Sequence, residues 1–103
     1  MRHYDVKRGY EGNLQPDNLR ALVTESFGDC AEEEGRFIAS FGAIRQISVW
    51  SDGKGLIVNA EMDATVSDEI AMETIRRYND FLSKTTGYSA KERKKRAEKE
   101  AKK

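Results

Sequence analysis

The stretch that decides the fold is Arg36–Met62, RFIASFGAIRQISVWSDGKGLIVNAEM. Its apolar and polar residues alternate in three runs, which predicts strands over residues 36–41, 44–50 and 56–62. Gly42-Ala43 is short enough to join the first two strands tightly, and Asp52-Gly53 is a strong hairpin signal between the second and third. The stretch therefore predicts an antiparallel meander of three strands.

The alternation also assigns the residues of each strand to one or the other face of the sheet. The inward face carries the apolar residues of each run: Phe37, Ala39, Phe41, Ile47, Val49, Leu56, Val58, Ala60 and Met62. The other face receives the residues between them: Arg36, Ile38, Ser40, Ile44, Gln46, Ser48, Trp50, Ile57 and Asn59. The second set is more apolar than a fully solvated sheet face requires.

Elements on both sides of the meander follow the helical period. Residues 16–27 place Leu19, Leu22, Val23 and Phe27 on one stripe, and Gly28 suits the end of that helix. A second helix begins after a cap at Thr65 or Ser67 and ends at Gly87, with its stripe at Ile70, Ala71, Thr74, Ile75, Tyr78, Phe81 and Leu82. A short strand is expected over residues 3–7, and residues 32–34, three glutamates, are expected in a solvated loop. The order β-α-β-β-β-α indicates an α+β fold with both helices on one face of an antiparallel sheet.

The charge is distributed unevenly along the chain. The 103 residues have a net charge of zero, but residues 89–103 hold six Lys and two Arg against three Glu, a net +5. Residues 1–88 hold ten basic and fifteen acidic residues, a net −5. We therefore expect one domain over residues 1–88 and a charged C-terminal extension over 89–103.

The extension is expected to be helical, because Ser89-Ala90-Lys91-Glu92 matches a capping box. Its basic side chains could contact nucleic acid or another anion: Lys91, Arg93, Lys94, Lys95, Arg96 and Lys99. The acidic body would repel a phosphate backbone, and no aromatic residue lies among these cations to stack on bases. Two other interpretations of the extension are a solvated helix and a helix that lies on the acidic body.

Few residues could support catalysis or bind a metal. One histidine, His3, and one cysteine, Cys30, are too few for the usual zinc set, and nothing in the sequence pairs them. The carboxylates around Cys30 would raise the pKa of its thiol, which disfavours a nucleophile. Gly53-Lys54-Gly55 joins two predicted strands rather than a strand and a helix, so it is a turn and not a phosphate loop. We predict no enzymatic activity, metal or cofactor.

The single cysteine and the lack of an apolar signal or membrane segment favour a cytoplasmic protein. The predicted contact surface is the outer sheet face, with Ile38, Ile44, Gln46, Ser48, Trp50 and Ile57. An apolar patch with an aromatic residue is typical of an interface. We expect a non-enzymatic binding or assembly module, either a homodimer or the partner of another protein. The alternative is a nucleic-acid-associated accessory protein that uses the basic helix.

Three segments resemble a small archaeal family of unknown function found in methanogens: Tyr4–Gly9, Phe41–Ile44, and Thr74–Leu82 followed by Thr86–Arg93. The resemblance implies a cytoplasmic archaeal domain and carries no catalytic or ligand residues. The order of elements also resembles half of a TATA-binding-protein-like fold. That likeness concerns topology, which does not define function.

Overall fold

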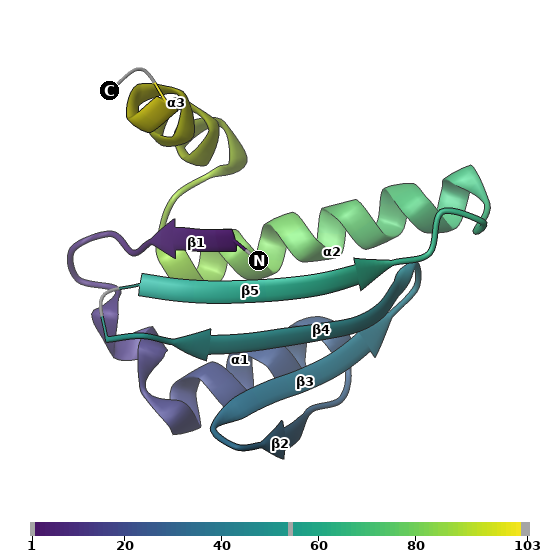
Figure 1. Ribbon diagram of the computed structural model, residues 1–103, viewed down its shortest axis with the longest axis horizontal. Coiled ribbons are helices and arrows are strands. Elements are labelled where there is room, and N and C mark those ends of the chain that lie inside the picture. The colour runs from purple at the N-terminus through teal and green to yellow at the C-terminus, as the bar shows by residue number, and fades with distance from the viewer. Residues whose placement is uncertain (1, 54, 102–103) are drawn as a thin grey trace.

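The computed structural model describes residues 2–53 and 55–101, and in the last helix it describes side chains through Arg96 and at Glu98. It contains a five-stranded sheet, three α-helices and one short 3-10 helix (Figure 1). The strands are β1 (Arg2–Asp5), β2 (Ala31–Glu33), β3 (Arg36–Phe41), β4 (Ile44–Ser51) and β5 (Gly55–Met62). The helices are η1 (Glu11–Leu14), α1 (Pro16–Phe27), α2 (Asp68–Thr86) and α3 (Ala90–Ala101).

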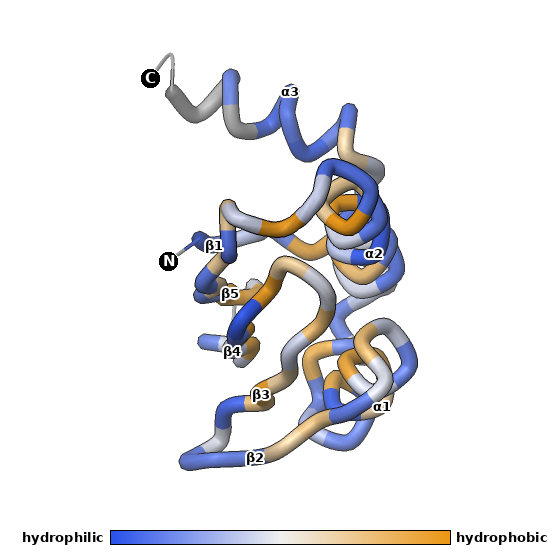
Figure 2. Tube along the Cα trace, turned by 90° about the vertical axis from the view of Figure 1, so that its right-hand side faces the viewer, coloured by the Kyte–Doolittle hydropathy of each residue, from blue (hydrophilic) through white to orange (hydrophobic). Residues whose placement is uncertain are grey.

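The sheet has the order β1-β5-β4-β3-β2, and all neighbouring strands are antiparallel. The predicted meander is confirmed as β3, β4 and β5, with Ser51 opposite Leu56 across the Asp52-Gly53 turn. Both long helices lie on one face of this sheet, and the opposite face is open (Figure 2). The predicted α+β architecture is therefore confirmed.

The core lies between the sheet and the two helices. Leu19, Val23 and Phe27 of α1 and Phe81 and Leu82 of α2 pack against the inward residues of the strands. Phe27 contacts both Phe41 and Phe81, with ring centroids 6.4 and 5.3 Å apart. The ends of the helices also follow the sequence: Gly28 and Gly87 adopt left-handed conformations after α1 and α2, and the Ser67 hydroxyl accepts the N–H of Ile70.

The sequence pattern missed the strand β2. Residues 31–33 pair with β3, with Glu33 opposite Arg36, instead of forming a solvated loop. All three residues are exposed, so their alternation carries no hydrophobic signal. Glu34, at φ 51°, and Gly35, at φ 80°, form the turn that reverses the chain into β3.

Ile44 was placed on the wrong face by strict alternation. The register of β4 shifts between Ile44 and Gln46, which is the signature of a β-bulge. The bulge turns the Ile44 side chain inward, where it is 1% exposed and belongs to the core together with Ile47 and Val49. The open face therefore has one apolar residue fewer than the alternation predicts.

Four residues predicted to be inward are exposed instead: Ala60, Met62, Ile70 and Ile75. They lie at the end of β5 and in the first half of α2. The core cluster holds no α2 residue before Phe81, although Thr74 is fully buried. The sheet and α2 thus extend beyond the main core at this end of the molecule.

Candidate binding surfaces

The open sheet face carries five of the six predicted contact residues. Trp50 lies opposite Ile57, and Ile38 lies opposite Ser48, so the four side chains are neighbours across three strands. The guanidinium of Arg36 lies 4.3 Å from the centroid of the Trp50 ring, a cation–π contact that covers part of the indole. A cavity of about 470 Å³ beside this pair is lined by Glu33, Glu34, Arg36, Ile38, Gln46 and Ser48.

A second surface was not anticipated from the sequence. Met62, Met72 and Ile75 are 52%, 64% and 54% exposed, whereas no apolar side chain of the open face is that accessible. Ile75 and Met62 line a cavity of about 330 Å³ between α2 and β5, together with Arg2, Val58, Ala60 and Tyr78. Met72 lies three residues from Ile75 on α2 and therefore on the same side of the helix. We call Met62, Met72 and Ile75 the edge patch.

The edge patch lies beside an incompletely covered strand. β1 pairs with residues 55–58 of β5, and among the described residues no strand pairs with 59–62 along that edge. Figure 1 shows β1 as a short arrow along one half of β5. Edge strands with free backbone groups are templates for pairing with another chain. An accessible apolar patch and an open strand edge thus occur together.

The C-terminal helix α3 begins with the predicted capping box. The Ser89 hydroxyl accepts the N–H of Glu92 at 3.2 Å, and the Glu92 carboxylate accepts the N–H of Ser89 at 3.2 Å. The hydrogen bond from the Ser89 N–H to the carboxylate is the main cause that holds the pKa of Glu92 below its usual range, and the Ser89 side chain adds to it. The two arginines of α3 turn back to the body, as the self-contact interpretation anticipated.

Arg93 is the more deeply inserted of these two arginines. It donates to the Ser83 hydroxyl at 3.1 Å, to the Asn79 side-chain oxygen at 3.2 Å, and to the carbonyl of Tyr88. Its partial burial lowers the pKa of its guanidinium, against a smaller opposing effect of Tyr4 and Tyr78. Arg93 therefore anchors the first turn of α3 to α2.

Arg96 forms an ion pair with Asp5 of β1 at 2.9 Å and lies over the Tyr88 ring, 4.7 Å from its centroid. The other cations with described side chains, Lys91, Lys94 and Lys95, are exposed. Lys99 lies in α3, but its side chain is outside the described part. The basic helix thus contacts the body through its two arginines, of which Arg96 remains exposed, and presents lysines to solvent.

A cavity of about 470 Å³ separates β1 from α3, and all four residues of β1 line it together with Tyr88, Arg93 and Arg96. A hydrogen bond with Tyr4 is the main cause that raises the pKa of Arg2. The hydroxyls of Tyr4 and Tyr78 lie 3.1 Å apart, and burial, followed by this contact, raises the pKa of Tyr78. The residues that line this cavity each carry a guanidinium, carboxylate, imidazole or hydroxyl group.

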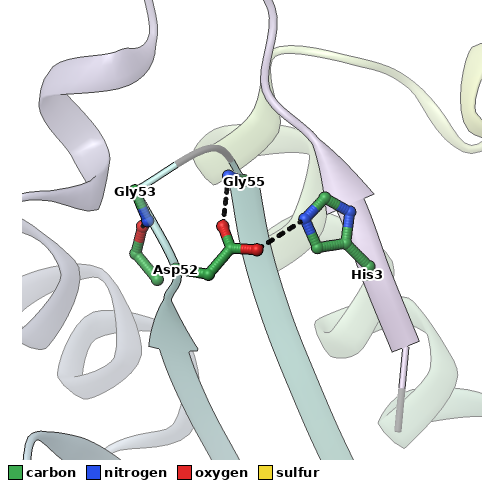
Figure 3. Close-up of polar contacts among 5 residues, drawn as sticks. His3, Asp52, Gly53 and Gly55 are labelled. Atoms are coloured by element: carbon green, nitrogen blue, oxygen red, sulfur yellow. Dashed lines mark hydrogen bonds and ion pairs between the residues drawn. The ribbon is translucent and has the colours of Figure 1, made fainter.

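His3 contacts Asp52 and not Cys30. Its Nε2 lies 3.3 Å from Asp52 Oδ2, while the other carboxylate oxygen of Asp52 accepts the N–H of Gly55 at 2.9 Å (Figure 3). Cys30 lies just before β2, at the opposite edge of the five-stranded sheet from β1. Burial is the largest cause that raises the pKa of the Cys30 thiol, with Asp29 and Glu32 adding to it. No Cys–His pair forms.

Two further features of the described residues concern metals and membranes. They contain no group of three or more His, Cys, Asp or Glu side chains that could hold a metal ion. Among them, none of the helices combines the length and the apolar character that a membrane crossing requires.

The fold and these surfaces define a small α+β domain with a docked C-terminal helix, and comparison with known proteins places it in a family. A family described as "Domain of unknown function (DUF5611)" matches residues 1–99, and the chain belongs to this family. The match extends across the body and most of the basic helix. None of the curated proteins matches the chain.

A solved structure is similar over nearly the whole length. It is the NMR solution structure of hypothetical protein TA0095 from Thermoplasma acidophilum, an archaeon, with 36% identity and a TM-score of 0.70. The similarity covers 94% of this chain and 97% of that one. The expected resemblance to a family of unknown function is therefore confirmed, whereas the likeness to half of a TATA-binding-protein-like fold is not.

Proposed function

We propose that this protein is a non-enzymatic assembly module that pairs with a second copy of itself through the β5 edge and the edge patch. The observation that carries the proposal is that Met62, Met72 and Ile75, three of the most exposed large apolar side chains described, lie beside the uncovered half of β5. A cytoplasmic location stays a prediction that rests on the single cysteine.

A second copy of the chain fits this edge because a two-fold axis can relate two identical β5 strands. Two identical β5 segments can pair antiparallel about a two-fold axis, which joins the sheets and brings the two α2 helices together. An isologous contact places each apolar patch against itself, so Met72 and Ile75 would pack against their equivalents. Such a contact would give the free backbone N–H and C=O groups at the edge of β5 hydrogen-bond partners, and it would bury the edge patch at the same time.

Charges on α2 support the same arrangement. Glu69 and Arg76 flank Met72, three residues before it and four after it, and both are exposed on the same side of the helix. In an antiparallel pair of α2 helices centred near Met72, Glu69 of one copy faces Arg76 of the other. Opposite charges in register would favour this orientation over a parallel one.

The oligomeric state tests the proposal. The native protein is expected to have the mass of a dimer in sedimentation equilibrium, and Ile75→Glu is expected to have the mass of a monomer. Trp50→Glu is the matched control, because it places the same charge on the open face and should leave the dimer intact. A monomeric native protein, or an Ile75→Glu variant that remains dimeric, would contradict the proposed edge contact.

The opposite pattern would assign the interface to the open face around Trp50, the surface predicted from the sequence. In that case Trp50→Glu would dissociate the dimer and Ile75→Glu would not. A charge exchange gives an independent check of the edge contact: Glu69→Arg should weaken the dimer by about tenfold or less, and adding Arg76→Glu should restore it.

The nucleic-acid hypothesis is less well supported. Arg93 and Arg96 are engaged with the body. Of the cations of α3 whose side chains are described, Arg96 is exposed together with Lys91, Lys94 and Lys95. Binding of double-stranded DNA that weakens steeply with salt and is lost without residues 89–103 would revive this hypothesis.

A further inference from the structure

The cavity between β1 and α3 contains an excess of positive charge. Arg2, Arg93 and Arg96 contribute three guanidinium groups, and Asp5 contributes one carboxylate. The guanidinium and carboxylate groups of the lining sum to a net charge of +2, although residues 1–88 carry −5. Like charges that line one cavity repel each other, and a bound anion would relieve that repulsion.

The residues that surround the cavity hold its arginines in defined positions. Arg93 is fixed by its bonds to α2 and to Tyr88, and Arg96 is fixed between Asp5 and the Tyr88 ring. At the other end, Asp52 fixes the His3 ring (Figure 3). Cations held before a ligand arrives lose little conformational entropy when they bind it.

We propose that this cavity binds a phosphate group carried by a small molecule or free in solution. The forked N–H donors of arginine match the oxygens of phosphate, and tyrosine hydroxyls and an imidazole can add hydrogen bonds. The volume of about 470 Å³ exceeds what a bare phosphate needs and lies in the range of small-ligand sites. The site is formed by the two ends of the described chain, and one of its lining residues, Arg2, also lines the cavity beside the edge patch.

Titration monitored by two-dimensional NMR of backbone amides tests this site. Inorganic phosphate and glycerol 3-phosphate are added in parallel, with sodium chloride at matched ionic strength as the reference. Both phosphates are expected to shift the amides of residues 2–5 and 88–96 in a saturable manner, and chloride is not. Tighter binding of glycerol 3-phosphate would assign a small organic phosphate, and equal binding would assign the inorganic ion.

Two substitutions separate a phosphate site from general electrostatic attraction. Arg2→Gln should weaken phosphate binding at least about tenfold, whereas Arg20→Gln, which removes the same charge from α1, should leave it unchanged. Asp5→Asn removes the competing carboxylate and should tighten binding several-fold, even though it removes the ion pair with Arg96.

The direction in which each substitution changes phosphate affinity tests the proposal. If Asp5 and Arg96 serve only to dock α3, Asp5→Asn loosens the helix and phosphate binding does not improve. That result, equal effects of Arg2→Gln and Arg20→Gln, or shifts that chloride reproduces, would overturn the proposal. Dispersed amide spectra of all variants confirm that the fold is retained in each comparison.

Discussion

Two buried threonines of α2 have the same exposure and opposite hydrogen-bonding states. Thr74 is fully buried, and its hydroxyl accepts the N–H of Ala43 at 2.9 Å and donates to the carbonyl of Ile70 at 2.7 Å. Thr85 is also fully buried, but its hydroxyl has no hydrogen-bond partner within the described structure. Thr74 thus ties α2 to the β3–β4 turn, and it also packs against Gly42, where a side chain would collide with its hydroxyl.

Replacement by valine, which has nearly the same shape, is therefore expected to act in opposite directions. Thr74→Val leaves the N–H of Ala43 buried without an acceptor and should lower the free energy of unfolding by about 1–3 kcal/mol. Thr85→Val removes an unpaired hydroxyl and should raise it by about 1 kcal/mol. Urea unfolding monitored by Trp50 fluorescence measures both. Equal losses of stability in the two variants would contradict this account.

At the scale of single elements, the start of α3 depends on a titrating group. The N–H of Ser89 is the main cause that keeps the pKa of Glu92 below 4.5, and the Ser89 side chain adds to it. Because the folded-state pKa is lowered, the cap contributes fully above the unfolded value and is lost as the pH falls through the folded value. The sequence motif therefore implies a helix whose first turn is sensitive to acid.

The expected result is a loss of helical ellipticity below about pH 4.5, with the Glu92 carboxyl titrating in the same range by carbon NMR. Glu92→Gln is the matched control, because glutamine can cap the same N–H but cannot titrate. The variant should lack the part of the transition that belongs to Glu92. An identical transition in the variant would show that other carboxylates control the helix.

Elements whose residues show a clear hydrophobic period or a local capping motif could be predicted from the sequence, and elements without such a signal could not. The bounds of α1 were predicted correctly, because Pro16, the stripe ending at Phe27 and Gly28 all indicate the same helix. The capping box of α3 is encoded by neighbouring residues alone. In contrast, β2 has no buried residue, and the bulge that turns Ile44 inward depends on how β4 pairs with β3 and β5.

The candidate sites were harder to predict than the fold for a related reason. The helical period assigned Ile75 to the core, and strand alternation assigned Met62 to it, but exposure depends on where the opposite layer ends. The cavity between β1 and α3 unites residues more than 80 positions apart, such as Asp5 and Arg96. No local pattern of charge could indicate that Arg93 and Arg96 fold back onto β1 and α2.

At the scale of the whole molecule, the core is complete without α3. Every residue of the hydrophobic core cluster lies at or before Leu82, and the sheet ends at Met62. The helix α3 adds the contacts of Arg93 with α2 and of Arg96 with β1. This distribution supports the division into a domain over residues 1–88 and an extension over 89–103, which stays a prediction.

Deletion of residues 89–103 is therefore expected to leave a folded domain with a melting temperature lower by several degrees. The loss follows from removing the Arg93 and Arg96 contacts, and about 1 kcal/mol corresponds to roughly 4–8 °C for a domain of this size. Thermal unfolding followed by circular dichroism measures the shift, and Arg93→Gln with Arg96→Gln in the full chain should reproduce most of it. An unfolded truncated chain would show that α3 belongs to the domain.

The position of β1 has a consequence for the kinetics of folding. β2, β3, β4 and β5 form hairpins between neighbours in sequence, but β1 must find residues 55–58, about fifty positions away. Pairing at such separation closes a long loop and is expected to form late and to open first. Each opening of β1 doubles the uncovered edge of β5, so that a β1 strand from another chain could take the vacant place. The short N-terminal strand thus makes this fold susceptible to strand exchange between molecules.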